Sequence, residues 1–147
     1  MSRIELLQIL TGFLGSVGFA VLFNIRGKRL VAASIGGGLS WLFYLLLNRL
    51  FSNDVLCYFL VSVLLAIYAE VMARVLKTPT TTFITTGLIP LVPGSSLYYT
   101  MTYAFSRQGE AFLEKGIHTL GLAGALAFGI ILVAGITAAW RRFSPRS

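Results

Sequence analysis

Five apolar stretches, each long enough to cross a lipid bilayer, constrain this chain more than any other feature. A helix rises 1.5 Å per residue, so about 20 apolar residues span a hydrocarbon core of about 30 Å. The stretches lie at about 5–24, 30–49, 54–75, 83–105 and 117–140. Only 12% of the 147 residues are charged, whereas soluble domains carry about 25%. We therefore expect an all-α integral membrane protein, with a single membrane domain over residues 1–147.

The basic residues predict how the chain is oriented in the membrane. Eight of the twelve lysines and arginines lie in loop 24–29, loop 74–82 and the carboxyl-terminal tail, and four lie in the other connections. Because cytoplasmic loops carry the excess of positive charge, the amino terminus is expected outside and the carboxyl terminus in the cytoplasm. The net charge of +7 does not predict nucleic-acid binding, since the charges are not gathered on one solvated face.

The first apolar stretch could be mistaken for a secretory signal peptide. Glu5 weakens the basic amino-terminal region that such peptides carry, and apolar residues continue past Ala20. We expect this stretch to remain in the protein as a span.

An acidic residue, Glu70, lies within the third apolar stretch. It follows the start of that stretch by sixteen residues, about 24 Å along a helix, which places it inside the hydrocarbon near the cytoplasmic face. Ionisable groups at such depth are costly and indicate function. The sequence favours a proton-coupling or gating role for Glu70 and for Arg74, which follows on the same helix face. A plain ion pair, with Arg74 reaching toward water, is the equally weighted alternative.

The fourth stretch is interrupted by Pro90, Pro93 and Gly94. Each proline removes an amide donor and clashes with the preceding turn, so we expect two half-helices, at about 83–89 and 95–105. The second half should begin at Ser95 or Ser96, which are good capping residues.

The amide end of this second half-helix would lie at membrane depth. Transporters use such ends to hold anionic substrate groups. The predicted substrate-binding residues, drawn from both halves, are Pro93, Gly94, Ser95, Ser96, Tyr98 and Thr86. A proline kink that only shapes packing is the alternative.

Small residues recur every four positions in three of the stretches. The stripes are Gly12, Ser16 and Ala20; Ala32, Gly36 and Ser40; and Gly121, Ala125 and Gly129. Such stripes let helices approach closely in lipid, either within the subunit or against another one. The run 36–38, three consecutive glycines, indicates a flexible point or a close approach.

No catalytic constellation is found in the sequence. There is no Ser/His/acid set and no phosphate-binding glycine loop, and the single cysteine, Cys57, allows neither an intrachain disulfide nor a metal site. We expect no enzymatic activity, no cofactor and no metal.

The chain resembles the carboxyl-terminal half of the bacterial threonine/serine exporter family over nearly its whole length. The resemblance rests on Phe23-Asn24 before a basic turn, Glu70-x-x-Ala73-Arg74, Pro79, the segment 87–94 (GLIPLVPG) and Tyr98. Some members of that family carry ten spans in one chain, and others are split into a larger subunit and a small five-span subunit. This chain is similar to the small subunit, including the one implicated in succinate export.

The resemblance implies a small subunit of a secondary exporter in the bacterial inner membrane. It would pair with a larger subunit of the same family and export a small carboxylate solute: succinate, threonine or serine. The alternative is a non-transporting accessory subunit that stabilises or regulates a membrane partner.

Overall fold

The computed structural model describes residues 3–143, and every regular element in them is a helix. The elements are α1 (Arg3–Leu22), α2 (Lys28–Leu50), α3 (Asp54–Leu76), α4 (Thr80–Leu88), the 3₁₀ turn η1 (Ile89–Leu91), α5 (Gly94–Phe105) and α6 (Gly109–Phe143). Four of them, α1, α2, α3 and α6, are long and apolar enough to cross a membrane. The all-helical membrane fold is confirmed, and the first three predicted stretches match their helices to within a few residues.

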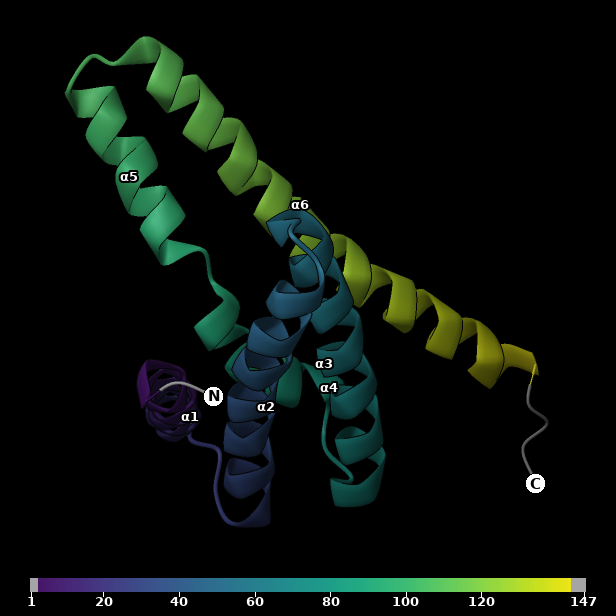
Figure 1. Cartoon of the computed structure of the whole chain (residues 1–147). Coiled ribbons are helices and arrows are strands. Elements are labelled where there is room, and N and C mark those ends of the chain that lie inside the picture. The colour runs from purple at the N-terminus through teal and green to yellow at the C-terminus, as the bar shows by residue number, and fades with distance from the viewer. Residues whose placement is uncertain (1–2, 144–147) are drawn as a thin grey trace.

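Helix α2 lies at the centre of a bundle formed with α1, α3, α4 and η1. Helix α6 packs across α3, and α5 packs on the amino-terminal half of α6 as a hairpin that stands apart from α1 (Figure 1). The crossing of α6 over α3 is tight, because a Cβ added at Gly129 would lie 1.9 Å from Ser62 Oγ. Helix α5 therefore packs mainly on α6 and is joined to the bundle through Val92 and Pro93, which follow η1.

The predicted fourth span is broken, as expected, between α4 and α5. The two prolines of this segment, Pro90 and Pro93, fall in η1 and at the N-cap of α5. Helix α4 has 9 residues and α5 has 12, so neither half alone reaches the roughly 20 residues that a crossing requires. Five crossings, and the orientation derived from them, stay predictions.

The connection predicted at 74–82 is shorter than expected. Helix α3 continues to Leu76, Lys77 takes a left-handed conformation (φ 48°), and its N–H donates to the carbonyl of Ala73. Pro79 then occupies the N-cap of α4, where a fixed φ and a missing N–H are tolerated. The threonine-rich segment is therefore helical from Thr80.

The last helix begins earlier than predicted. The sequence suggested a separate connection at 106–116 before a span at 117–140, but α6 runs unbroken for 35 residues, about 52 Å. Glu110 lies in its first turn, where a negative charge stabilises the helix dipole. No proline occurs between 109 and 143, so nothing in the sequence ends the helix before the membrane stretch.

The glycine run of α2 is a point of close approach and not of helix breakage. A Cβ at Gly37 would lie 1.8 Å from Ser16 Oγ of α1, and one at Gly36 would lie 2.9 Å from the ring of Tyr68 in α3. The Tyr68 hydroxyl donates to the carbonyl of Ala32 at 2.7 Å. These small residues are used for packing within the chain.

Candidate functional site

The backbone break between α4 and α5 is covered by hydroxyl groups from two neighbouring helices. Pro90 has no N–H, so the carbonyl of Thr86 loses the donor four residues ahead that a continuous helix would supply and accepts from the N–H of Ile89 instead. Ser16 Oγ of α1 donates to this carbonyl at 3.1 Å, and Ser40 Oγ of α2 donates to the carbonyl of Gly87 at 2.9 Å. Freed backbone groups at membrane depth require such partners.

Close packing seals the same side of the break. The side chains of Phe83 and Leu91 are fully buried, and a Cβ added at Gly12 would lie 3.4 Å from Pro90 Cβ. Gly87 faces α3, where an added Cβ would meet Leu65 Cδ1 at 2.4 Å. The break is therefore packed on one side against residues of α1, α2 and α3.

The start of α5 differs from the prediction in one respect. Pro93 is the N-cap and makes no side-chain capping bond, so the helix begins at Gly94 and the two serines lie inside the first turn. Gly94 N–H donates to the carbonyl of Val92, and Leu97 N–H to that of Pro93. Between them, the amides of Ser95 and Ser96 have no acceptor among residues 3–143.

The predicted substrate-binding side chains are not all gathered in one place. Pro93 and Ser96 are buried, whereas Gly94 and Ser95 are exposed. Tyr98 is 68% exposed and stacks edge-on with Tyr99. The Thr86 hydroxyl is fully buried and donates to the carbonyl of Thr82 at 2.9 Å. The chain alone therefore does not bring Thr86 and Tyr98 together.

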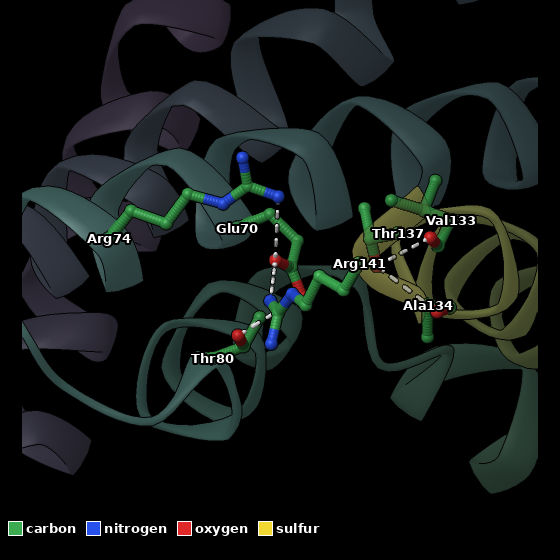
Figure 2. A network of polar contacts seen from close by, with 7 residues as sticks. All are labelled: Glu70, Arg74, Thr80, Val133, Ala134, Thr137 and Arg141. Carbon is green, nitrogen blue, oxygen red and sulfur yellow. Dashed lines mark hydrogen bonds and ion pairs between the residues drawn. The ribbon is translucent and has the colours of Figure 1, made fainter. Parts of the chain in front are cut away.

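Glu70 joins three helices through both of its carboxylate oxygens (Figure 2). Its Oε2 accepts a hydrogen bond from the Arg141 guanidinium of α6 at 2.6 Å and lies 3.8 Å from Arg74 of the same helix. Its Oε1 accepts from the Thr80 hydroxyl of α4 at 3.2 Å. The Glu70 side chain is only 13% exposed, while both arginines are 60% exposed.

This geometry makes Arg141, and not Arg74, the closer partner of Glu70. Charge-assisted hydrogen bonds of this length are among the strongest in proteins, and the contact at 3.8 Å to Arg74 is beyond hydrogen-bond range. The predicted pairing with Arg74 exists but is the weaker one. The sequence showed Arg141 only as one basic residue of the tail, because a partner 71 positions away carries no local signal.

The Glu70 carboxylate is compensated by two guanidinium groups and one hydroxyl donor. Its ion pair with Arg141 is one of several polar contacts between α3 and α6, together with the pair of His118 and Asp54 at 3.8 Å and Ser62 Oγ, which donates to the carbonyl of Ala125 at 3.4 Å. Residues 3–143 contain no group of three His, Cys, Asp or Glu side chains that could hold a metal ion.

Comparison with known proteins agrees with this architecture. A family model described as Threonine/Serine exporter, ThrE, matches residues 8–136. Searches of curated proteins and of solved structures returned no match. The family match covers most of the chain, including the break, Glu70 and all four long helices in whole or in large part. The chain therefore belongs to the threonine/serine exporter family of membrane transport proteins.

Proposed function

We propose that this chain is the small subunit of a secondary exporter in the bacterial inner membrane, and that it works with a larger subunit of the same family. The complex would move a small carboxylate solute (threonine, serine or succinate) out of the cytoplasm. The family match over residues 8–136 supports the exporter role. The observation that carries the proposal is the covered break, which leaves the amide end of α5 unpaired close to a bundle that is otherwise tightly packed.

The substrate carboxylate is proposed to bind at the start of α5. Ser95 and Ser96 offer two backbone amides without acceptors, and the positive end of the helix dipole favours an anion there. Pro93 and Gly94 fix where these amides begin. Tyr98 offers an exposed hydroxyl in the next turn. Thr86 remains the proposed contact from the α4 side of the break.

We propose that Glu70 is the group whose protonation is coupled to transport. In the arrangement described, Glu70 is paired with Arg141 and Thr80. Protonation would release Arg141, and reformation of the ion pair would restore the closed arrangement. Arg74, one turn along α3, would favour the return of Glu70 to its charged form, so that the ion pair with Arg141 can form again.

Export assays on two variants test these assignments. We expect Glu70→Gln and Pro93→Ala, each co-expressed with the larger subunit, to lose most export while still inserting in the membrane. Arg142→Gln is the matched control, because Arg142 neighbours Arg141 and has no contact with Glu70. Full export by both variants would remove both assignments.

A second candidate function is a non-transporting accessory subunit. It is favoured by the separation of Thr86 from Tyr98, because the proposed substrate residues do not enclose a solute within this chain alone. Deleting this chain while expressing the larger subunit discriminates between the two. Export at the full rate by the partner alone would establish the accessory role, and loss of export restored by the wild-type chain but not by Pro93→Ala would establish the transport role.

A further inference from the structure

A polar cavity of about 360 Å³ lies between the loop joining α1 to α2 and the loop joining α3 to α4. Both loops are at the lower end of the bundle in Figure 1. The cavity is lined by Asn24, Ile25, Arg26, Arg29, Thr78, Pro79 and Thr82. None of these residues belongs to the proposed substrate contacts or to the ion-pair cluster around Glu70. The cavity therefore needs an explanation of its own.

The free polar groups that line this cavity are mostly hydrogen-bond donors. Two arginines supply guanidinium groups, and no carboxylate lines the cavity. Across residues 3–143, neither Arg26 nor Arg29 has a carboxylate within ion-pair distance. Arginine donates up to five hydrogen bonds and accepts none. The cavity thus carries two positive charges that the described part of the chain does not compensate.

The remaining polar groups extend this donor set. Asn24 Oδ1 already accepts from Arg26 Nε at 2.9 Å, and the Asn24 NH₂ group remains as a donor. The Thr78 hydroxyl donates to the carbonyl of Leu76, whereas the Thr82 hydroxyl has no acceptor among the described residues. With two guanidinium groups, which only donate, a ligand that accepts hydrogen bonds at several atoms fits this set best.

The backbone of both loops is held by hydrogen bonds. Asn24 takes a left-handed conformation (φ 58°), with its N–H donating to the carbonyl of Val21. In the facing loop, Thr78 N–H donates to the carbonyl of Ala73, and Thr82 N–H to that of Pro79. Because the backbone of both loops is hydrogen-bonded, little additional ordering of the backbone is required when a ligand binds.

We propose that this cavity binds an anionic group, a carboxylate or a phosphate, held between Arg26 and Arg29 with Thr82 and the amide of Asn24 as further donors. Guanidinium groups bind both anions through paired, charge-assisted hydrogen bonds. A free dicarboxylate and the phosphate of an anionic phospholipid present this same chemistry. The site is separate from the proposed substrate contacts and does not depend on them.

Binding measurements on the purified full chain test the site. The chain is placed in nanodiscs of phosphatidylcholine and titrated with succinate, and separately with inorganic phosphate. We expect Arg26→Gln/Arg29→Gln to bind at least about 10-fold more weakly than wild type, because charge-assisted bonds are lost. Arg107→Gln, which removes one positive charge from the turn between α5 and α6, should bind as wild type. Arg26→Lys/Arg29→Lys keeps the charge and should retain part of the binding.

A second arm identifies the source of the anion. Nanodiscs of mixed phosphatidylcholine and phosphatidylglycerol are analysed by native mass spectrometry for retained anionic lipid. Retention by wild type and Arg107→Gln, lost in Arg26→Gln/Arg29→Gln, would assign the site to a lipid phosphate, and succinate binding in the neutral discs would assign it to a free dicarboxylate.

Two outcomes overturn the proposal. One is that wild type and Arg26→Gln/Arg29→Gln behave alike toward succinate, inorganic phosphate and phosphatidylglycerol. The other is that Arg107→Gln weakens binding as much as the double variant does, since the effect would then be one of net charge. Far-ultraviolet circular dichroism shows whether a variant has folded. If Arg26→Gln/Arg29→Gln has not folded, the binding measured for Arg26→Lys/Arg29→Lys tests the proposal in its place. Because binding is read without transport, failure of the exporter proposal leaves this result unaffected.

Discussion

At Gly37 a single methyl group decides whether α1 and α2 can pack as they do. A Cβ there would lie 1.8 Å from Ser16 Oγ and 2.5 Å from Ser16 Cβ. Ser16 cannot turn away without losing its hydrogen bond to the carbonyl of Thr86. The glycine is therefore required by the contact that covers the break, and not by backbone conformation.

We expect Gly37→Ala to lower the stability of the chain by about 1–3 kcal/mol, the usual cost of overpacking. Thermal unfolding of the purified protein in detergent measures this cost. Gly135→Ala is the control, because no atom lies within 4 Å of a Cβ added at Gly135. Adding Ser16→Gly to Gly37→Ala should recover part of the loss, and no difference between the Gly37 and Gly135 variants would show that the contact is not needed.

The ion pair between Glu70 and Arg141 is a second contact that depends on two single residues. Their atoms lie 2.6 Å apart across two helices, so the two substitutions Glu70→Gln and Arg141→Gln should not be additive. A double-mutant cycle of unfolding free energies should give a coupling of about 1 kcal/mol. The same cycle with Arg142→Gln should give none, and equal coupling to both arginines would contradict the pairing.

At the scale of the elements, α4 and α5 depend on helices that the chain places elsewhere. Ser40 Oγ shares its hydrogen between the carbonyl of Gly87 across the α2–α4 contact (2.9 Å) and the carbonyl of Gly37 in its own helix (2.8 Å), whereas Ser34 Oγ donates only to the carbonyl of Leu30 in its own helix. The two serines are both buried and lie on the same helix. Comparing Ser40→Ala with Ser34→Ala therefore distinguishes the loss of a hydrogen bond to the break from the general loss of a buried hydroxyl.

Ser40→Ala should therefore destabilise the chain by about 1–3 kcal/mol, since a buried carbonyl loses a partner. Ser34→Ala should cost less, because the carbonyl of Leu30 keeps its place in the helical ladder. Unfolding temperatures of the two variants, measured side by side, make the comparison. Equal losses would mean that Ser40 does not support the break.

The break itself could be predicted from sequence, because Pro90 and Pro93 act on their own turns through sterics and missing donors. The exact start of α5 was not predicted: the sequence favoured Ser95 or Ser96, whereas Pro93 is the N-cap in the structure. Glu70 was identified by its depth alone. Its closest partners, Arg141 and Thr80, come from other helices and depend on how these pack, which no local pattern encodes.

At the scale of the whole molecule, the number of crossings depends on the broken segment. If α4 and α5 together cross the membrane, the turn at 106–108 lies outside with the turn at 51–53, and the turn at 77–79 lies in the cytoplasm. If they enter and leave on one side, 106–108 and 77–79 share that side. The large exposed apolar surface of α1 and α6 is compatible with lipid in both arrangements.

We expect five crossings. In a Cys57→Ser background, Ser52→Cys and Ser106→Cys should react with a membrane-impermeant maleimide added to intact cells, and Lys77→Cys should react only after the cells are broken. All three positions are exposed in the structure, so burial does not confound the labelling. A Ser106→Cys that behaves like Lys77→Cys would refute the fifth crossing and, with it, the cytoplasmic position of the carboxyl terminus.

The unbroken length of α6 has a mechanical consequence. Its first half carries α5, its middle rests on α3 where Gly129 meets Ser62, and its last turn is tied to Glu70 through Arg141. One unbroken helix of about 52 Å therefore contacts α5 near its start and Glu70 near its end. If the proposed substrate and coupling roles hold, a movement of α5 and a change at Glu70 would act on the same helix.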